Sequence, residues 1–195
     1  MKKILLSALF VISASFAAAQ TVDIYSDTTH GAGSTETIRV FTKDVDVLLF
    51  FVGSKQSDNE VGHTWLMRQD AKGFFRFGGY VANWPTTNNN FAIPFSVWHR
   101  DFGTCKFDGT MGAYIPVGHG PRSLFSDQIS LTAPLRSGWS VGLASSFGAW
   151  QGSDPVIKVG MIATKVLSKN TTVSGRILSD LDGHLYGRIL YSLSQ

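Results

Sequence analysis

Four basic side chains have the spacing to act together on a charged solute. Arg76, Lys158, Arg176 and Arg188 each occupy the polar row of a segment in which polar and apolar residues alternate, and those rows carry no acidic residue. If the rows face a common interior, the cations either pair with carboxylates from other segments or create a field that favours anions. The sequence predicts that these four side chains line a lumen.

The histidines and serines do not form a recognisable catalytic or metal-binding motif. The five histidines show no His-x-x-x-His spacing, and one cysteine cannot complete a structural zinc site. His119, Ser123 and Asp127 have the residue types of a catalytic triad, but no Gly-x-Ser-x-Gly turn surrounds the serine. His99 and Asp101 are interpreted as part of a charged cluster at a strand end. We therefore assign no catalytic residue, no metal ligand and no cofactor.

The segment around Asp182 and Gly183 has a faint similarity to a calcium-binding loop. Residues 180–183 read Asp-Leu-Asp-Gly, but the remaining ligands and the terminal glutamate of such a loop are missing. An Asp-Gly pair between alternating segments is a strong signal for a two-residue β-hairpin, because both central positions need positive φ. The sequence predicts a hairpin turn at this point.

The first 19 residues have the three parts of a secretory signal peptide. Lys2 and Lys3 form a basic start, residues 4–16 form an apolar run broken only by serines, and residues 17–19 are alanines. Cleavage after Ala19 would leave a net charge of about +1, so the basic composition does not indicate a nucleic-acid partner. The chain is predicted to be exported.

The remainder of the chain predicts an all-β fold. Period-two alternation runs through residues 139–149 and 156–167, and turn residues recur every 10 to 18 positions. We expect an antiparallel up-and-down β-barrel of roughly 8 to 12 strands over residues 35–195. Residues 20–34, which are polar and contain glycine, are expected to form a flexible N-terminal arm, with a weak first strand as the alternative.

The composition of the two rows predicts which face of each strand meets lipid. The polar rows are mostly Gly, Ser and Ala, which suit a crowded lumen better than a solvated surface. Trp139 and Phe147 stand eight residues apart, about 26 Å in an extended strand, which is close to the apolar band of a membrane barrel. The residues predicted to face lipid are Trp139, Val141, Leu143, Phe147, Ile189, Tyr191 and Leu193.

On these features the chain resembles the small bacterial outer-membrane β-barrels, the group that contains outer membrane proteins A and X. The resemblance is architectural and includes an amphipathic last segment, residues 187–193, although the chain closes with Ser194 and Gln195. It implies an outer-membrane location, contact with membrane lipid and insertion by the barrel assembly machinery. It also implies loops that meet an extracellular ligand, with residues 53–60, 83–90 and 101–109 as candidates.

Three functions remain open at this point. The leading hypothesis is a barrel with a structural, adhesive or surface-protective role and a narrow lumen that favours anions. The alternative is a soluble β-sandwich or barrel, periplasmic or secreted, that binds a glycan or a protein. Pro94 and Pro116, inside predicted strands, and residues 47–52, apolar on both faces, favour that alternative. The third is a membrane-embedded lipid-modifying enzyme.

Overall fold

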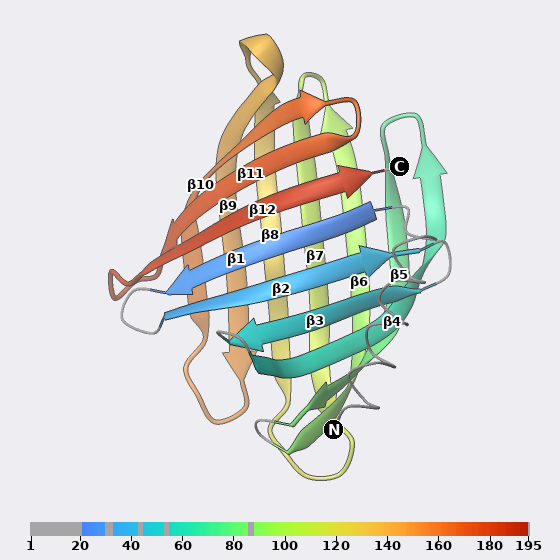
Figure 1. Cartoon of the computed structure of the whole chain (residues 1–195), viewed down its shortest axis with the longest axis vertical. Coiled ribbons are helices and arrows are strands. Elements are labelled where there is room, and N and C mark those ends of the chain that lie inside the picture. Colours follow the sequence, from blue (N-terminus) through green and yellow to red (C-terminus); the bar gives the residue numbers. More distant parts are fainter. Residues whose placement is uncertain (1–20, 30–32, 43–44, 53–54, 86–87, 195) are drawn as a thin grey trace.

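The computed structural model describes residues 21–29, 33–42, 45–52, 55–85 and 88–194, and these form a closed antiparallel barrel of twelve strands. Each strand pairs with its neighbour in the sequence, and β1 closes the barrel against β12 (Figure 1). The predicted all-β up-and-down barrel is therefore confirmed. The strands are β1 Thr21–Thr29, β2 Gly33–Phe41, β3 Asp46–Val52, β4 Lys55–Asp70, β5 Gly73–Trp84, β6 Asn89–Phe102, β7 Cys105–Pro116, β8 Ser123–Pro134, β9 Trp139–Trp150, β10 Val156–Ser168, β11 Thr171–Ser179 and β12 Leu185–Ser194, with a short 3₁₀ turn, η1, at Arg136–Gly138.

The N-terminal segment differs from the flexible arm expected over residues 20–34. Residues 21–29 form β1, which pairs along its whole length with β12 from Thr21 opposite Ser194 to Thr29 opposite Tyr186. β1 also pairs with β2, which begins at Gly33. Closure requires these strands, because a closed barrel leaves no edge with unpaired backbone groups. Among the described residues, no helix has the length and apolar character needed to cross a membrane.

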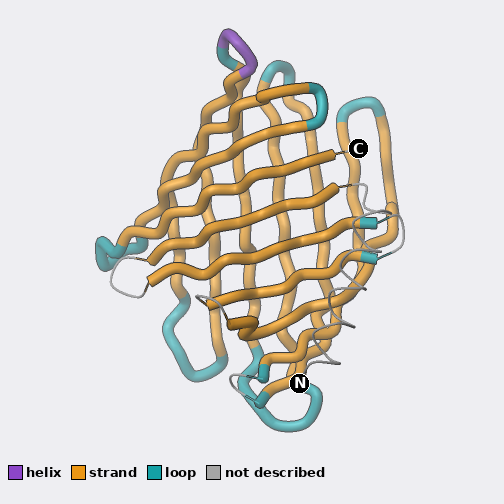
Figure 2. Tube along the Cα trace, viewed as in Figure 1, coloured by secondary structure: helices purple, strands orange, loops and turns teal. Residues whose placement is uncertain are grey.

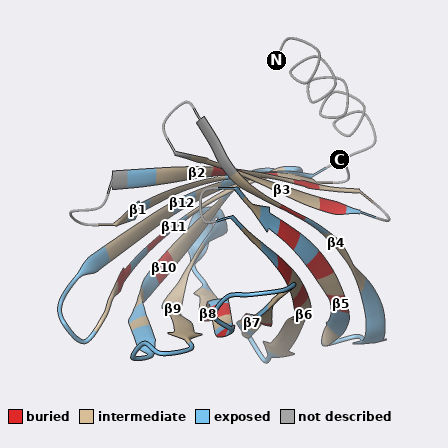
Figure 3. Ribbon diagram, turned by 90° about the horizontal axis from the view of Figure 1, so that it is seen from below, coloured by how far each residue is buried: buried red, intermediate tan, exposed pale blue. Residues whose placement is uncertain are grey.

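The outer wall of the barrel is rich in exposed apolar side chains. Leu143 on β9 is 66% exposed and Ile189 on β12 is 62% exposed, and Val81 and Ile177 on other strands are similarly open. Buried residues occur as short stretches within the strands and not as a separate layer (Figure 3). An apolar exterior of this extent is the opposite of what a soluble sandwich or barrel presents to water.

The inner side holds the most deeply buried apolar residues. Tyr80, Ala82, Phe91 and Ile93 form one cluster on β5 and β6, and Leu48, Phe95 and Phe125 are among the partly buried side chains that pack against it. A smaller cluster lies on β9, β10 and β11. The barrel interior is therefore filled with side chains on one part of its wall, as expected for a barrel of modest strand number.

Both prolines that favoured a soluble fold are accommodated in the closed barrel. Pro94 lies inside β6, where it is opposite Gly79 of β5. On the other side, the ladder between β6 and β7 has no pair at Ile93 or Pro94 and resumes at Phe95. Pro116 is the last residue of β7. A local interruption of one ladder removes the need for the N–H group that proline lacks.

The turns at the two ends of the barrel differ in length (Figure 2). Residues 71–72, 103–104 and 169–170 are two-residue turns at the end that also holds Thr21 and Ser194, here called the terminal end. The opposite end, here called the loop end, carries residues 117–122, 151–155 and 180–184. The expected loop at 101–109 is therefore a tight turn at the terminal end. Of the expected loop at 83–90, residues 83–84 belong to β5 and residues 89–90 to β6, at the loop end. Of the expected loop at 53–60, residues 53–54 lie outside the described chain, and the rest belongs to β4.

Candidate functional site

Four charged side chains meet inside the barrel, and we call Asp27, Asp127, Arg176 and Arg188 the central ion network. Arg188 on β12 donates to Asp27 on β1 at 2.5 and 2.9 Å and to Asp127 on β8 at 2.6 Å. Arg176 on β11 donates to the Asp127 carboxylate at 3.3 Å and to its backbone carbonyl at 2.7 Å. Because three strands separate β8 from β12 in the wall, these contacts cross the interior.

The charged groups of the central ion network border three cavities, and a fourth of about 500 Å³ is lined by Arg176 and Arg188 together with outer-wall residues such as Met161, Ile177 and Ile189. The largest of the three, here called the main cavity, has about 450 Å³ and extends toward β2 to β8. The other two, of about 260 and 170 Å³, lie along β7 to β12 and at β8 to β12 with β1. Arg188 lines all three, and Arg176 lines the two smaller ones. The network therefore stands where the parts of the lumen meet, and it restricts passage between them.

A second ion pair lies deeper in the wall beside the main cavity. Arg39 on β2 forms a bidentate pair with Asp46 on β3, with distances of 2.5 to 3.1 Å. Tyr80 on β5 donates its hydroxyl to the same carboxylate at 2.6 Å. Asp46 is buried, and Arg39 is largely so. These contacts compensate both charges and hold the side chains of β2, β3 and β5 together beside the main cavity.

The four predicted lumen cations fall into two groups. Arg176 and Arg188 belong to the central ion network, so these two cations are paired with carboxylates from other strands. Lys158 lines the 170 Å³ cavity with its amine 3.5 Å from the centre of the Tyr186 ring. Arg76 lies near the terminal end of β5, exposed, with its guanidinium 5.6 Å from the Phe74 ring centre. No ion pair within the described ranges includes Lys158 or Arg76.

The sequence did not single out the acidic partners of these cations. Asp27 occupies the polar row of β1 with Asp23 and Tyr25. Because this segment was expected to be a flexible arm, its polar row was not considered as part of the lumen. Asp127 was considered only with His119 and Ser123. In the structure Ser123 donates to the Leu124 carbonyl and Asp127 binds the two arginines, so no hydrogen bond among the described atoms joins the three as a triad.

The predicted lipid-facing residues have different exposures in the structure. Leu143 and Ile189 are the most open of the seven, and Trp139, Tyr191 and Leu193 are also exposed. Val141 and Phe147 are half-buried. All seven lie in β9 or β12, within the apolar rows on which the expectation rested.

The charged cluster at the terminal end is centred on His99. Its Nδ1 lies 2.7 Å from Asp108 and its Nε2 lies 3.3 Å from Asp101. The ring also stacks on Phe74, with 5.7 Å between ring centres. This arrangement links β6 to β7 and to the turn that joins them, in agreement with the expectation of a charged cluster at a strand end.

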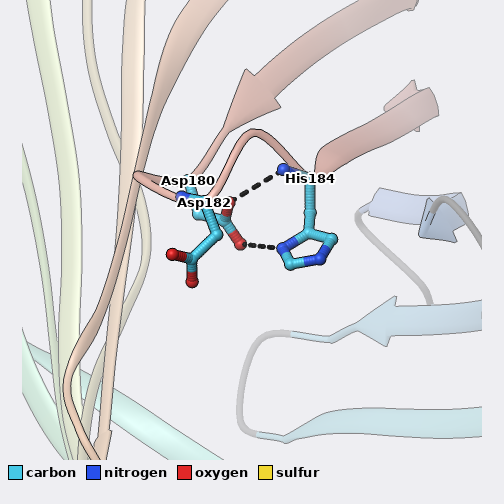
Figure 4. Close-up of side chains that lie close together, drawn as sticks. All are labelled: Asp180, Asp182 and His184. Carbon is cyan, nitrogen blue, oxygen red and sulfur yellow. Dashed lines mark hydrogen bonds and ion pairs between the residues drawn. The ribbon is translucent and has the colours of Figure 1, made fainter.

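The turn between β11 and β12 is longer than the predicted two-residue hairpin and is organised by Asp180 (Figure 4). Its carboxylate accepts hydrogen bonds from the backbone N–H groups of Asp182 at 3.0 Å and His184 at 2.9 Å, and from the Tyr186 hydroxyl at 2.9 Å. Asp180, Asp182 and His184 have potential metal-ligating atoms within 4.8 Å of one another. In Figure 4 the Asp182 carboxylate extends away from the His184 ring, and the contacts of Asp180 are those that hold the turn together.

Replacement of Asp180 by alanine is expected to loosen this turn in a pH-dependent way. Burial raises the pKa of the Asp180 carboxyl, but the hydrogen bonds from His184 and Tyr186 outweigh it and lower the pKa below its ordinary value. The stabilisation is therefore present above about pH 4 and is lost as the pH falls through the lowered pKa. Hydrogen exchange at the amides of Asp182 and His184 should be about tenfold faster in Asp180→Ala at neutral pH. Equal protection factors in the two proteins at neutral pH would contradict this role.

Sequence comparison and fold comparison give different results. No protein-family model matches the chain, and no curated protein matches its sequence. The KdgM porin in complex with disordered oligogalacturonate has a TM-score of 0.67 at 10% identity, with 90% of this chain and 99% of that chain covered. The NanC porin has a TM-score of 0.63 at 10% identity, with 89% and 100% covered. The chain has the fold of these porins. The expected architecture of a small outer-membrane β-barrel is thereby confirmed.

Proposed function

We propose that this barrel is a porin of the bacterial outer membrane, through which small hydrophilic solutes pass a narrow lumen that favours anions. Closure of the sheet satisfies the backbone groups that lipid cannot, and the exposed apolar outer wall matches the hydrocarbon region of a bilayer. The likeness to porins supports a channel, whereas nothing in the described contacts favours an adhesive or protective role.

The observation that carries the proposal is the charge along one side of the lumen. The two smaller cavities are lined by four cations and three carboxylates. Two of the cations belong to the central ion network, so Lys106 and Lys158 are the cations there that it does not contain. The excess of positive charge at a narrow passage favours anions. The charged groups are Lys106, Lys158, Arg176 and Arg188 with Asp27, Asp108 and Asp127.

The substrate class follows from the same chemistry. One of the porins with this fold was solved in complex with oligogalacturonate, an acidic oligosaccharide. Small acidic saccharides would use the cations of this lumen as carboxylate-binding groups, with Ser and Thr hydroxyls of the 260 Å³ cavity available to sugar hydroxyls. We therefore propose acidic saccharides as the class to be tested first.

The proposal includes the orientation of the barrel in the membrane. The seven residues from Trp139 to Leu193 named above would face lipid, and the barrel assembly machinery would insert the chain. Short turns on the periplasmic side and longer loops outside are typical of outer-membrane barrels. The terminal end would therefore face the periplasm, and the loop end, with residues 117–122, 151–155 and 180–184, would meet extracellular solutes.

Lys158→Gln is expected to weaken the anion preference of the channel. The amine of Lys158 borders the 170 Å³ cavity without an ion-pair partner in the described chain, so its charge acts on the passing ion. The measurement is the reversal potential of the purified barrel in planar bilayers under a KCl gradient. We expect the ratio of chloride to potassium permeability to fall about twofold or more.

Lys165→Gln is the matched control for this measurement. Lys165 lies on the same strand, but its amine donates to the Ser137 carbonyl at the terminal end and borders none of the three cavities. Its replacement should leave the permeability ratio unchanged. Absence of any conductance for the folded wild-type barrel would reject the channel, and equal ratios for Lys158→Gln and wild type would reject the anion preference.

A further inference from the structure

The main cavity contains a buried carboxylate that the proposed ion pathway does not use. Glu60 on β4 lines this cavity and is only 7% exposed. It accepts a hydrogen bond of 3.0 Å from the Tyr114 hydroxyl, and no ion pair among the described residues includes it. A buried carboxylate without a counter-ion is costly, so a cation that enters the cavity would gain free energy there.

The other charges that line the main cavity already have partners. Arg39 is bound to Asp46, which is buried and does not itself line the cavity. Arg188 is bound to Asp27 and Asp127. Within each of these groups the opposite charges lie in direct contact, so their fields largely cancel in the cavity. Glu60 is the remaining acidic or basic residue of the described lining, and it carries a negative charge when its carboxyl is ionised.

A continuous wall of aromatic rings leads to Glu60. Tyr80 meets Phe95 edge to face at 5.2 Å, Phe95 stacks on Phe125 at 6.1 Å, and Phe125 meets Tyr114 at 4.7 Å between ring centres. All four rings line the main cavity, and the hydroxyl of the last one binds Glu60. Aromatic faces attract cations and also accept apolar surface.

The size of the cavity fits a small organic molecule. Its volume of about 450 Å³ falls within the range of ligand pockets, and its lining is mainly aromatic and aliphatic, with Leu48, Phe50 and Ile93 opposite or beside the rings. Threonine hydroxyls, the phenol of Tyr25 and one glutamine provide the remaining polar groups. An inorganic cation would leave most of this apolar surface without a partner.

We propose that the main cavity is a binding site for a small organic cation, an amine or quaternary ammonium with an apolar or aromatic body. The charged nitrogen would lie against Glu60, and the apolar body would pack on the wall formed by Tyr80, Phe95, Phe125 and Tyr114. The site lies on the side of the central ion network opposite to the cation-lined cavities, so it is separate from the proposed anion pathway.

The test is equilibrium binding of phenethylammonium to the folded barrel in detergent, measured by isothermal titration calorimetry at about pH 8.5, where the buried carboxyl is ionised and the amine still carries its proton. The neutral probe 2-phenylethanol has the same ring and chain with a hydroxyl in place of the ammonium group. We expect phenethylammonium to bind about tenfold or more tightly than 2-phenylethanol, because only the ammonium pairs with Glu60. Equal affinities, or no heat of binding for the ammonium at millimolar concentrations, would overturn the proposal.

Glu60→Gln keeps the shape of the side chain and its capacity to accept the Tyr114 hydrogen bond, but removes the charge. We expect it to reduce the affinity for phenethylammonium about tenfold and to leave that for 2-phenylethanol within about twofold. Glu36→Gln is the control: Glu36 is the other glutamate of the chain, it accepts a hydrogen bond from Ser26, and it borders none of the three cavities. If the two variants lose affinity equally, Glu60 is not the binding group.

A second variant addresses the case in which Glu60→Gln fails to fold. Tyr114→Phe keeps the ring but removes the hydroxyl that donates to Glu60. At the pH of the binding measurement the carboxyl stays largely ionised and depends more on an external cation, so the affinity for phenethylammonium should be retained or increased. A loss of affinity in this variant, while the unboiled barrel still migrates as a folded band, would overturn the proposal. Because binding is measured without ion flow, its result is independent of whether the barrel conducts anions.

Discussion

Leu143→Arg is expected to destabilise the membrane-inserted barrel by about 2–4 kcal/mol, the cost of an arginine on the lipid face of such a barrel near the bilayer centre. Leu143 is the fifth of the twelve residues of β9, and its side chain is 66% exposed on the outer wall. In a bilayer the new guanidinium would lie in hydrocarbon, whereas in water it would be solvated at little cost. The measurement is the free energy of unfolding in urea from phospholipid vesicles.

Leu181→Arg is the matched control for this substitution. Leu181 is 92% exposed in the turn between β11 and β12, outside the strands that form the wall. Its replacement should change the unfolding free energy by no more than about 0.5 kcal/mol. If the two arginines cost the same in vesicles, or if Leu143→Arg is neutral there, the outer wall does not face lipid, and the outer-membrane location fails with it.

The strands that were best predicted from the sequence are those with complete alternation. Residues 139–149 and 156–167 correspond to β9 and β10 almost residue for residue. Each is paired on both sides and has one face toward the exterior, so period two is maintained except at the bulge between Val166 and Ser168 of β10. The sequence pattern and the structure agree here because both follow from the alternation of side chains between the two faces of a strand.

β1 was predicted only as the alternative to a flexible arm, because its apolar row is short. Val22 and Ile24 alternate with polar residues, but the same row continues with Ser26 and Thr28, so the pattern resembles a polar loop. What makes the segment a strand is the pairing with β2 and β12, and the partner in β12 lies more than 150 residues away. Such pairing depends on closure of the whole sheet, which no local window contains.

The glycines in the polar rows have a reason different from the one that the sequence suggested. Small residues were interpreted as a sign of a crowded lumen. At Gly142 a Cβ atom would collide with the carbonyl oxygen of Leu131, and at Gly160 with that of Ile177, both on the backbone of a neighbouring strand. Close approach of strand backbones, which depends on the local bend of the sheet, requires glycine at these two positions.

The hairpin at Asp182 and Gly183 shows how a correct local signal can give a wrong turn length. Gly183 has a φ of +84°, as the Asp-Gly pair predicted. The connection nevertheless extends over residues 180–184, because the Asp180 carboxylate accepts hydrogen bonds from the backbone N–H groups of Asp182 and His184, and the second of these would otherwise be available to the ladder. A side chain competed with the strand pairing, and propensity alone does not reveal which of them prevails.

Most ion pairs of the lumen could not be predicted from the sequence, for a related reason. Arg188 and Asp27 are 161 residues apart, and Arg188 and Asp127 are 61 apart, so their meeting depends on which strands face one another across the closed barrel. Arg39 and Asp46 are only seven residues apart in a hairpin, and this pair was accessible to a local argument. The cations were found in the sequence, but the balance of charge in the lumen was not.

Arg188→Met is expected to lower the free energy of unfolding by about 2–3 kcal/mol. The substitution leaves Asp27 without its arginine and Asp127 with Arg176 alone, while methionine fills part of the vacated volume. Removal of one partner from a fully buried ion pair costs about 3–5 kcal/mol, and the lower figure here allows for Asp127, whose side chain is 49% exposed. Urea unfolding from vesicles measures the loss.

The control for this prediction is an arginine whose ion pair lies at the rim. Arg100 pairs with Asp70 at 2.7 Å, but both side chains are more than a third exposed, so Arg100→Met should cost less than about 1 kcal/mol. Adding Asp27→Asn to Arg188→Met removes the uncompensated carboxylate and should recover part of the lost stability, because the penalty arises from the charge left behind. If the double variant is no more stable than Arg188→Met, packing of the arginine and not charge pairing accounts for the loss, and the central ion network does not stabilise the barrel through its charges.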